Sequence, residues 1–296
     1  MRSMKCDLVL ISAFIAFLIP LPTQRSLTNQ WNRLSAEALG RVGVAGLVIE
    51  SGESAAMNGS AHFPMQSVYK LPISMALLLL VDEGKISLDQ SIVVGPDQYV
   101  TGGKHSPLRD EFPGGTRKSV RELIRYTIVE SDGSASDALL RLVGGPSVVT
   151  RYVRSLGITE LIIANSEMDM SWQTQYDDWC TPQAAVQLLV ILEKGKTLSK
   201  SSRALLLQYM QETETGKMRI RHLLPKRTTV ADKTGASGTQ NGRTAATNDI
   251  GLVTLPDGRH LAIAIFVSDS EAPDEICDGV IAKIARAAWD EWSPAR

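Results

Sequence analysis

The chain reads Ser67-Val68-Tyr69-Lys70, followed by an apolar segment over residues 71–81. The length and composition of this segment predict a helix that begins close to Ser67, with Pro72 tolerated near its first turn. In such a helix Ser67 and Lys70 lie on one face about one turn apart, near enough to share a proton. A serine hydroxyl beside an amine is a candidate nucleophile with its own base.

The competing interpretation of Ser-x-x-Lys is an ordinary solvated helix surface, because a pattern of two fixed residues is common. The apolar segment argues against this interpretation, since residues 71–81 contain almost no polar side chain and would be buried on nearly every side. Lysine avoids such surroundings unless it is paired or used in chemistry. The motif therefore needs partners from elsewhere in the chain.

The bulk composition is that of an ordinary globular protein. The 296 residues are 44% hydrophobic and 21% charged, with a formal net charge of −1. Such a chain can bury a sizeable core as one large domain or two lobes. The balance of charges disfavours nucleic acid as a partner. Only four histidines occur and no Cys/His cluster exists, so we expect no metal site.

The first residues have the pattern of a secretory signal peptide. Arg2 and Lys5 precede an apolar run over residues 8–21, and polar residues follow. The run is short for a bilayer span and a proline ends it, which disfavours the alternative of an uncleaved membrane anchor. We expect a leader over residues 1–23, cut near residues 22–24, and a periplasmic or secreted protein that is free of the membrane.

Three cysteines are present, and one of them, Cys6, lies in the expected leader. Cys180 and Cys277 remain in the mature chain. Two cysteines of an exported protein could pair, and the sequence does not determine their separation. We expect two free, mostly buried thiols.

Strand patterns lie towards both ends of the chain and helical patterns in its middle. Helices are expected over residues 30–40, 116–130, 136–143, 146–156, 181–192, 200–212 and 281–292, besides the one that begins near Ser67. Strands are expected over residues 43–50, 229–233, 249–255 and 260–267, and mostly loop over residues 85–115 and 165–180. This order predicts a sheet completed by the two ends of the chain, with a helical lobe inserted.

Two further motifs follow the first one in a fixed order. Residues 131–133 read Ser-Asp-Gly, and residues 233–235 read Lys-Thr-Gly on an expected C-terminal strand. Each motif alone is common, whereas all three in order at plausible separations are not.

The three motifs match the needs of attack on a strained amide. That reaction requires a deprotonated hydroxyl, a proton for the leaving nitrogen and a cation for a substrate carboxylate. Ser67 and Lys70 meet the first need, and Ser131 can relay a proton to nitrogen. Lys233 with Thr234 offers a positive, hydrogen-bonding ledge for the carboxylate.

The developing oxyanion also needs donors. The backbone N–H groups of Ser67 and of Ala236, after Gly235 on the strand edge, are candidates for an oxyanion hole. We expect glycine at position 235 because a side chain there would crowd the nucleophile.

The chain resembles the class A serine β-lactamases over essentially its whole mature length. Besides the three motifs, the stretches over residues 63–70, 142–146 and 244–249 are similar to the extended-spectrum branch of that class. The resemblance implies the α+β two-lobe fold of serine β-lactamases and DD-peptidases, an antiparallel sheet with flanking helices plus an inserted all-α lobe.

The resemblance also implies boundaries and partners. Residues 24–60 and 214–296 would form the α/β lobe and residues 61–213 the all-α lobe of one catalytic unit. The unit would be a monomer that needs no cofactor and takes a small-molecule β-lactam.

A glutamate in a loop past the middle motif separates hydrolysis from mere acylation in this family. Glu167 lies 36 residues after Ser131, which is the family spacing. The resemblance implies that Glu167 holds and deprotonates the water that attacks the acyl-enzyme. Glu160 and Asp169 are rivals with less suitable spacing, and solvated surface is the plain alternative.

The chain departs from the family pattern at three positions near this loop. Gly133 stands where an asparagine usually contacts the substrate's side-chain carbonyl. Ser171 stands where another asparagine helps to hold the water, a task that a hydroxyl can share. Asn165 replaces an arginine that in many members braces the loop by a salt bridge, and the loop is about two residues shorter before Pro182. We expect this loop to be held differently.

The remaining candidates contact substrate. Arg219 stands where some members supply an extra guanidinium for the carboxylate, and ordinary surface is its alternative. His105 aligns with an aromatic residue at the cleft mouth and is expected to make a weak contact. Thr234, Gly235 and Ser237 complete the expected substrate-binding set, with Ala236.

The resemblance implies periplasmic hydrolysis of penicillins and cephalosporins through an acyl-enzyme on Ser67 that is deacylated through Glu167. One alternative is a penicillin-binding D-alanyl-D-alanine peptidase, which lacks such a glutamate. Another is a binding protein that is acylated but releases the drug slowly, to which Gly133 and Ser171 lend support. Whether Lys70 or Glu167, through a water, is the acylation base stays open.

Overall fold

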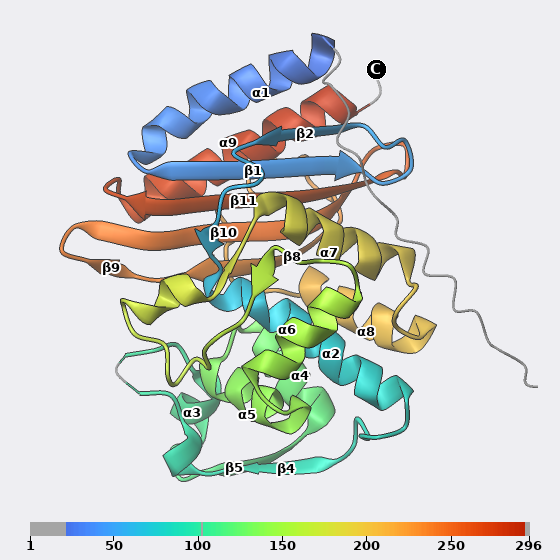
Figure 1. The fold of residues 1–296 in the computed structure, drawn as a ribbon, viewed down its shortest axis with the longest axis vertical. Coiled ribbons are helices and arrows are strands. Elements are labelled where there is room, and N and C mark those ends of the chain that lie inside the picture. Colours follow the sequence, from blue (N-terminus) through green and yellow to red (C-terminus); the bar gives the residue numbers. More distant parts are fainter. Residues whose placement is uncertain (1–21, 102, 294–296) are drawn as a thin grey trace, which may run out of the picture.

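The computed structural model describes residues 22–293 other than residue 102 (Figure 1). The expected leader and Cys6 lie outside the described residues, except that the last two leader positions open helix α1 (Pro22–Ser35). Within the described part of the chain, no helix has the length and apolar character needed to cross a bilayer.

A central antiparallel sheet is built from both ends of the chain. Its strands run in the order β2 (Ser54–Met57), β1 (Arg41–Val48), β11 (His260–Ser270), β10 (Arg243–Thr254) and β8 (Val230–Ala236), and β9 (Thr239–Gln240) pairs with β10. Strands β1, β10 and β11 are buried along nearly their whole length. β1 and β11 are apolar over most of it, whereas β10 also buries the polar side chains of Thr247, Asn248 and Asp249. β8 lies at the edge of the sheet, so its Lys-Thr-Gly motif faces the rest of the molecule.

Helices α1 and α9 (Asp274–Trp292) cover one face of the sheet (Figure 1). Trp31 of α1 and Trp292 of α9 meet edge to face with ring centroids 6.4 Å apart. The helix expected over residues 30–40 begins earlier, at Pro22, and ends at Ser35, before the short 3₁₀ turn η1 (Ala36–Ala38). α9 likewise begins before the expected residue 281, directly after Pro273.

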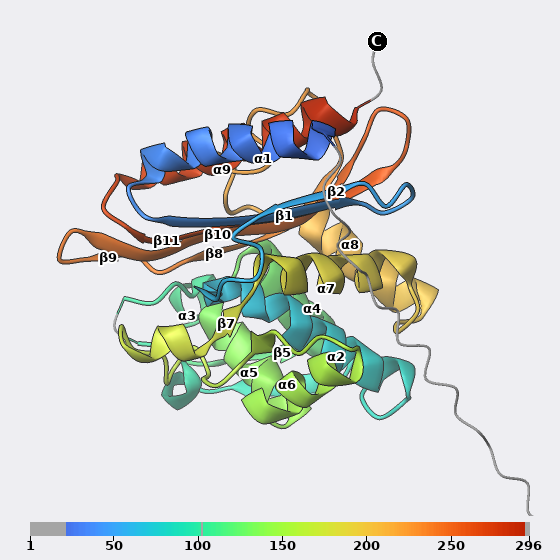
Figure 2. The ribbon, with the colours of Figure 1, turned by 45° about the horizontal axis from the view of Figure 1, so that its top comes forward.

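On the other side of the sheet lies a lobe of helices from the middle of the chain, and the last two of these helices pack against the sheet (Figure 2). The helices of this lobe are α2 (Lys70–Asp82), α3 (Pro107–Glu111), α4 (Val120–Val129), α5 (Gly133–Val143), α6 (Pro146–Ser155), α7 (Pro182–Lys194) and α8 (Lys200–Gln211). α2 is buried on nearly all sides in its first nine residues, as its apolar sequence predicts. The predicted fold class is confirmed, whereas the boundaries of the two lobes stay a prediction.

The region over residues 85–115 is mostly loop, as predicted, but it also contains three short elements. They are β4 (Ser91–Val94), the 3₁₀ turn η3 (Pro96–Gln98) and α3. Residues 116–119 form strand β5 (Thr116–Ser119), paired with β4, and were wrongly expected to be helical. The helix begins only at Val120 because Ser119 and Glu122 form a capping box there.

Three two-residue strands, β3 (Phe63–Pro64), β7 (Trp179–Cys180) and β6 (Leu161–Ile162), tie the segment before Ser67 to the loop that carries Glu167. Cys180 of β7 and Cys277 of α9 are both buried, free thiols. The expected state of these two cysteines is therefore confirmed.

Candidate active site

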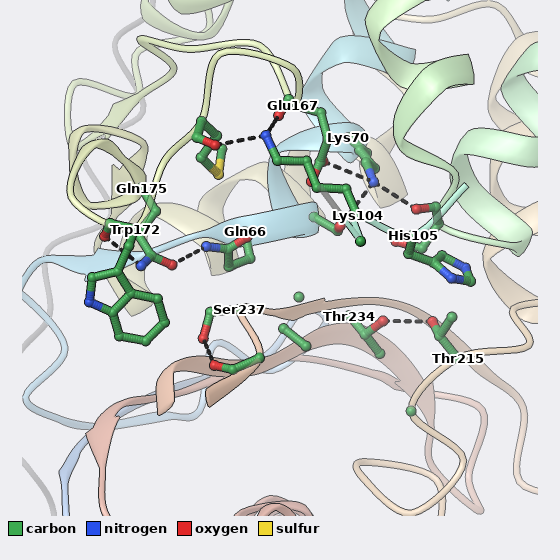
Figure 3. A pocket seen from close by; sticks show the side chains of 18 of the residues that line it. Gln66, Lys70, Lys104, His105, Glu167, Trp172, Gln175, Thr215, Thr234 and Ser237 are labelled. Carbon is green, nitrogen blue, oxygen red and sulfur yellow. Dashed lines mark hydrogen bonds and ion pairs between the residues drawn. The ribbon is translucent and has the colours of Figure 1, made fainter. Parts of the chain in front are cut away.

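A cleft of about 520 Å³ opens between β8, the start of α2 and the loop over residues 165–178 (Figure 3). Its lining includes every predicted site residue except Gly133 and Lys233, which are buried behind it. These lining residues are Ser67, Lys70, His105, Ser131, Glu167, Ser171, Arg219, Thr234, Gly235, Ala236 and Ser237. The volume is in the range of ordinary small-molecule sites.

Ser67 sits in the 3₁₀ turn η2 (Gln66–Tyr69), directly before the α-helix proper begins at Lys70. Gln66 has a φ of 47°, a left-handed conformation that non-glycine residues seldom adopt. The amide of Asn248 donates to the carbonyl oxygens of Pro64 (2.8 Å) and Met65 (3.1 Å). The backbone at Ser67 is therefore held in an uncommon shape by the neighbouring strand β10.

The ammonium group of Lys70 contacts two side chains and one backbone carbonyl. Its ammonium, 1% exposed, donates to Ser67 Oγ (2.9 Å) and to the carbonyl oxygen of Ser131 (2.7 Å). It also lies 3.3 Å from Glu167 Oε2. All three ammonium donors are thus engaged, which satisfies a buried charge.

Ser131 lies between two lysines. Its φ is 58°, and its hydroxyl accepts a hydrogen bond of 2.9 Å from Lys233 Nζ. Lys233 is fully buried, and burial lowers its pKa well below the usual value, with the positive charge of Lys70 adding to the effect against Asp249 and Asp232. A proton can therefore pass between the Ser131 hydroxyl and the Lys233 ammonium, whereas Lys70 contacts only the backbone carbonyl of Ser131.

The edge of β8 approaches Ser67 closely at Gly235. A Cβ atom at this position would lie 2.4 Å from the carbonyl oxygen of Met65 and 3.3 Å from the backbone nitrogen of Ser67. The prediction that a side chain at position 235 would crowd the nucleophile is confirmed. Ala236, the last residue of β8, follows in the cleft.

The Glu167 carboxylate faces Lys70 and is held by Tyr69, whose hydroxyl donates to Oε2 at 2.7 Å. Burial alone would raise the pKa of Glu167, but the Lys70 charge and the hydrogen bond from Tyr69 outweigh it, so the pKa lies below its usual value. Glu167 is consequently ionised at neutral pH and can accept a proton.

The loop of Glu167 is fastened at its base without an ion pair. Asn165 donates from its amide to Asp178 Oδ2 (2.8 Å) and to the carbonyl of Thr174 (3.1 Å). Asp178 Oδ1 accepts from the N–H groups of Ala164 (2.9 Å) and Asn165 (3.2 Å). Burial raises the pKa of Asp178 to about 6, against these hydrogen bonds. The expectation of a differently held loop is confirmed.

Gly133 opens α5 and has no free space beside it. A Cβ there would lie 2.9 Å from Glu167 Cγ, 3.1 Å from the carbonyl oxygen of His105 and 3.2 Å from Val100 Cγ2. The place of the missing side chain is therefore taken by the methylene groups of Glu167 and by the segment before α3.

Two predicted hydroxyls are already engaged with their own loops. Ser171 Oγ lies 3.1 Å from Thr174 Oγ1 and accepts from the Thr174 N–H at 3.1 Å. Ser237 Oγ donates to the carbonyl of Gly238 (2.7 Å) and accepts from the N–H of Ala246 (3.0 Å). Both border the cleft and would have to share these bonds with a ligand.

Thr234 and Arg219 approach the cleft from β8 and the segment before it. Thr234 Oγ1 lies 2.6 Å from Thr215 Oγ1. Arg219 donates to Asp278 (2.7 Å) and to the carbonyls of Gly235 (3.1 Å) and Asn248 (2.8 Å). Its guanidinium is thus held at the cleft by three hydrogen bonds, which disfavours the alternative that Arg219 is an ordinary solvated surface residue.

His105 lies exposed at the cleft edge, where its Nε2 donates to the carbonyl of Glu130 at 2.8 Å. Sequence reasoning missed its neighbour Lys104 and also Thr215, Trp172 and Gln175, all of which line the cleft. Gln175 is linked to Gln66 (2.5 Å) and to the carbonyl of Trp172 (2.6 Å). The partners of Lys104 and Gln175 are amides and carbonyls, and the partner of Thr215 is the hydroxyl of Thr234. No sequence motif marks such contacts.

Within residues 22–101 and 103–293, no three His, Cys, Asp or Glu side chains gather as a metal site would require. The chemistry available in the cleft is that of a serine hydroxyl with an adjacent amine and carboxylate. Fold and cleft together define the class of serine hydrolases.

Comparisons with known proteins narrow this class. The model of the "Beta-lactamase enzyme family" matches residues 26–292. Beta-lactamase VEB-1 of Pseudomonas aeruginosa is 38% identical over 287 residues, covering 96% of each chain. Extended-spectrum beta-lactamase PER-1 of the same organism is 40% identical over 251 residues, covering 84% of this chain and 81% of PER-1. The crystal structure of a β-lactamase from Chitinophaga pinensis has a TM-score of 0.87 and 45% identity, covering 90% and 98% of the two chains.

The chain therefore belongs to the β-lactamase enzyme family, as a class A member similar to the extended-spectrum enzymes. The prediction that the chain is a hydrolase of the β-lactam amide is confirmed.

Proposed function

We propose that the chain hydrolyses penicillins and cephalosporins through an acyl-enzyme on Ser67 that is released by a water activated by Glu167. The observation that carries this proposal is the connected set of Ser67 Oγ, Lys70 Nζ and Glu167 Oε2, joined at 2.9 and 3.3 Å. A peptidase that only acylates would need the first contact and not the second.

In the acylation step Ser67 Oγ attacks the β-lactam carbonyl and gives up its proton. Lys70, or Glu167 through a water, takes this proton, and both routes fit the observed contacts. The amide C–N bond then breaks as the Ser131 hydroxyl passes a proton to nitrogen and regains one from Lys233, whose ammonium donates to it. The backbone N–H groups of Ser67 and Ala236 would stabilise the oxyanion.

The substrate carboxylate would bind along β8, where the Lys233 ammonium donates to Ser131 Oγ at 2.9 Å. Thr234 and Ser237 supply hydroxyls at the cleft, and Arg219 adds a second positive charge beside Gly235. The exposed ring of His105 would contact the rest of the substrate at the cleft mouth.

In the deacylation step Glu167 takes a proton from water, and the resulting hydroxide attacks the ester carbonyl. The ester C–O bond breaks, and Ser67 Oγ recovers the proton that Glu167 took from water, passed on through Lys70, which contacts both groups. The low pKa of Glu167 favours its ionised form and so its readiness for this step. Ser171, which borders the cleft, would be the second group to hold the water.

We further propose a periplasmic location, which the basic, then apolar, then polar order of residues 1–23 supports. A β-lactam drug enters that compartment before it reaches its targets, so export would place the enzyme in its path.

The test is the time course of a chromogenic cephalosporin with the purified mature protein. We expect many turnovers per enzyme, whereas one stoichiometric burst would support the peptidase or the slowly releasing binding protein instead. Glu167→Ala should still acylate but accumulate the covalent intermediate, seen by intact-protein mass spectrometry. Glu160→Ala, at a glutamate outside the cleft that pairs with His62 at 3.4 Å, is the matched control and should turn over normally. Normal turnover of Glu167→Ala would remove Glu167 from this role.

A further inference from the structure

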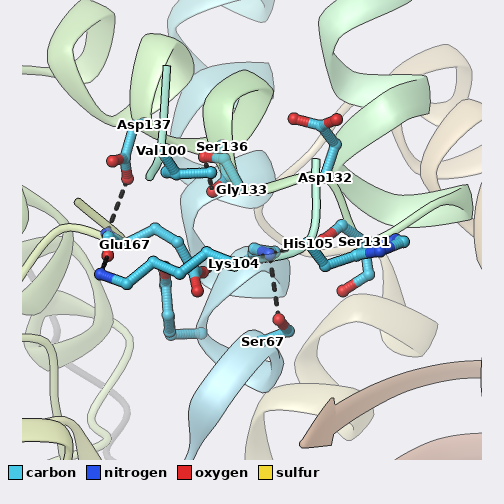
Figure 4. A network of polar contacts seen from close by, with 12 residues as sticks. Ser67, Val100, Lys104, His105, Ser131, Asp132, Gly133, Ser136, Asp137 and Glu167 are labelled. Atoms are coloured by element: carbon cyan, nitrogen blue, oxygen red, sulfur yellow. Dashed lines mark hydrogen bonds and ion pairs between the residues drawn. The ribbon is translucent and has the colours of Figure 1, made fainter. Parts of the chain in front are cut away.

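The Lys104 side chain reaches across to the loop that carries Glu167 (Figure 4). Its ammonium donates to the carbonyl oxygens of Glu167, Met168 (3.1 Å) and Met170 (2.7 Å). Three acceptors match the three donors of an ammonium group. All three acceptors belong to the backbone, so the contact is available whatever side chains the loop carries.

The opposite side of the same backbone is held by a carboxylate. Asp137 on α5 accepts from the N–H groups of Glu167 and Met168, both at 2.8 Å. The peptide groups around Glu167 thus lie between an anion on their N–H side and a cation on their carbonyl side. This arrangement aligns with the dipole of each peptide group and fixes the direction of the Glu167 side chain.

Lys104 is itself held in place. Arg109 on α3 donates to the carbonyl oxygens of Val100 (2.8 Å) and Lys104 (3.0 Å). The N–H of Gly133 donates to the carbonyl of His105 at 3.0 Å. The segment that presents the ammonium is therefore held by hydrogen bonds to the carbonyl oxygens of Val100, Lys104 and His105.

The contacts at the base of the Glu167 loop and beside Gly133 are weak, so the hydrogen bonds from Lys104 matter for the position of the loop. At its base Asn165 and Asp178 interact through a neutral amide, not through two opposite charges. Beside Gly133 there is no side chain to confine Glu167 laterally, because the Glu167 methylene groups occupy that space. The charge of Lys104 also acts on the carboxylate, since it adds to the larger effects of Lys70 and Tyr69 that lower the pKa of Glu167 against burial.

We propose that Lys104 is a positioning residue for deacylation, which clamps the backbone at Glu167 so that the carboxylate stays aimed at Lys70 and the attacking water. The inference rests on the proposed function, because it gives Lys104 a role only in the step that Glu167 performs. The inference takes Lys70, whose ammonium lies 2.9 Å from Ser67 Oγ, as the acylation base. On that basis Lys104 has no part in acylation, since its ammonium contacts neither Ser67 nor Ser131.

The experiment is removal and chemical restoration of the ammonium. Lys104→Cys deletes the donors, and alkylation with 2-bromoethylamine then builds S-aminoethylcysteine, which has the chain length of lysine. Cys180 and Cys277 are buried, so the exposed thiol reacts selectively in the mature protein. Lys85→Cys, at an exposed lysine that pairs with Glu83, is the matched control, and the parent protein is treated with the reagent in parallel.

We expect Lys104→Cys to keep its acylation rate within about threefold while the steady-state rate falls about 10- to 100-fold, a range typical of a catalytic group displaced by about 1 Å. A burst and an accumulating acyl-enzyme should appear in mass spectra. Aminoethylation should restore most of the steady-state rate at position 104 and change nothing at position 85.

Unchanged turnover of Lys104→Cys would overturn the inference, as would an equal loss in both steps or a failure of aminoethylation to restore the rate. If Glu167→Ala accumulates acyl-enzyme while Lys104→Cys turns over normally, the clamp is wrong and the proposed function stands. If Glu167→Ala itself turns over normally, the proposed function is wrong whatever Lys104 does.

Discussion

The two walls of the cleft are held by different means. On the Ser67 side the backbone belongs to η2, α2 and the sheet edge, and its charged groups Lys70 and Lys233 are buried. On the Glu167 side a loop with only the 3₁₀ turn η4 (Thr174–Asp177) is held by side chains that bond its backbone. Secondary structure and packing fix the first wall, and individual polar contacts fix the second.

This difference separates the two chemical steps. Changes on the Ser67 wall must disturb a packed core, so they should stop acylation or the fold itself. Changes on the Glu167 wall break single hydrogen bonds, each worth about 1 kcal/mol, so they should tune deacylation by modest factors. The experiments that follow test this contrast.

The largest effect is expected from Ser67→Ala, which deletes the nucleophile and leaves the buried contacts of Lys70 with the Ser131 carbonyl in place. Turnover of a chromogenic cephalosporin should fall by roughly 10⁴-fold or more, as for other serine nucleophiles. Intact-protein mass spectrometry should find no adduct even after long incubation. An adduct on the variant would show that another residue of this wall is acylated.

The Ser67 wall was largely predictable from the sequence, because its contacts join residues of three recognisable motifs. Lys70 and Ser67 are one helical turn apart. Lys233 lies on β8, and both β8 and its partner β10 were expected as strands near the C-terminal end of the chain. The close approach of the β8 backbone to Ser67 at Gly235 was also expected from the residue type alone. What joins these residues is the secondary structure, which periodic apolar patterns reveal.

The Glu167 wall was predictable in Glu167, Ser171 and Asn165, but not in the groups that hold its backbone. The spacing from Ser131 indicated Glu167, but the contacts of Lys104 end on carbonyl groups that every residue possesses. Strand β5 was missed for a related reason, since Thr116–Ser119 is short, polar and paired only with β4. Contacts between backbone and distant side chains leave no pattern in a single sequence.

A second test on the Ser67 wall is Gly235→Ala. The new methyl group would lie 2.4 Å from the Met65 carbonyl, so β8 must move away from Ser67 and the oxyanion donors must separate. We expect acylation to slow by about 10²- to 10³-fold, the usual loss for one oxyanion-hole donor, as measured by the burst rate. Gly279→Ala on α9, where nothing lies within 4 Å of the new methyl group, is the control. Near-normal acylation of Gly235→Ala would show that this wall is softer than its packing indicates.

Gly133→Asn restores the usual family residue and tests the boundary between the two walls. Its Cβ would collide with Glu167 Cγ at 2.9 Å and with the fixed carbonyl of His105. The loop is the weaker side, so Glu167 should yield, and deacylation should slow by about tenfold with acylation less affected. The ratio of burst rate to steady-state rate measures this effect. Gly114→Asn, in open space, should leave the ratio unchanged, and a faster steady state for Gly133→Asn would contradict the contact.

The smallest effect concerns the base of the Glu167 loop, where Asp178 has no cation beside it. Its pKa of about 6 in the folded protein exceeds the usual value for aspartate in an unfolded chain, about 3.9. The folded state therefore binds more protons between these two values, and stability from this group is lost as pH rises through 6. From pH 5 to pH 8 the loss should be roughly 1 kcal/mol in the free energy of unfolding.

Asp178→Asn, which keeps a carbonyl oxygen for the N–H groups of Ala164 and Asn165, should not show this loss of stability. Urea unfolding of both proteins at the two pH values measures the difference, with Asp89→Asn at an exposed aspartate far along the chain as control. A stability difference between the parent protein and Asp178→Asn that stays constant would mean that the pKa of Asp178 is not raised on folding. A difference that grows in favour of the parent at pH 8 would mean that the ionised carboxylate stabilises the loop base.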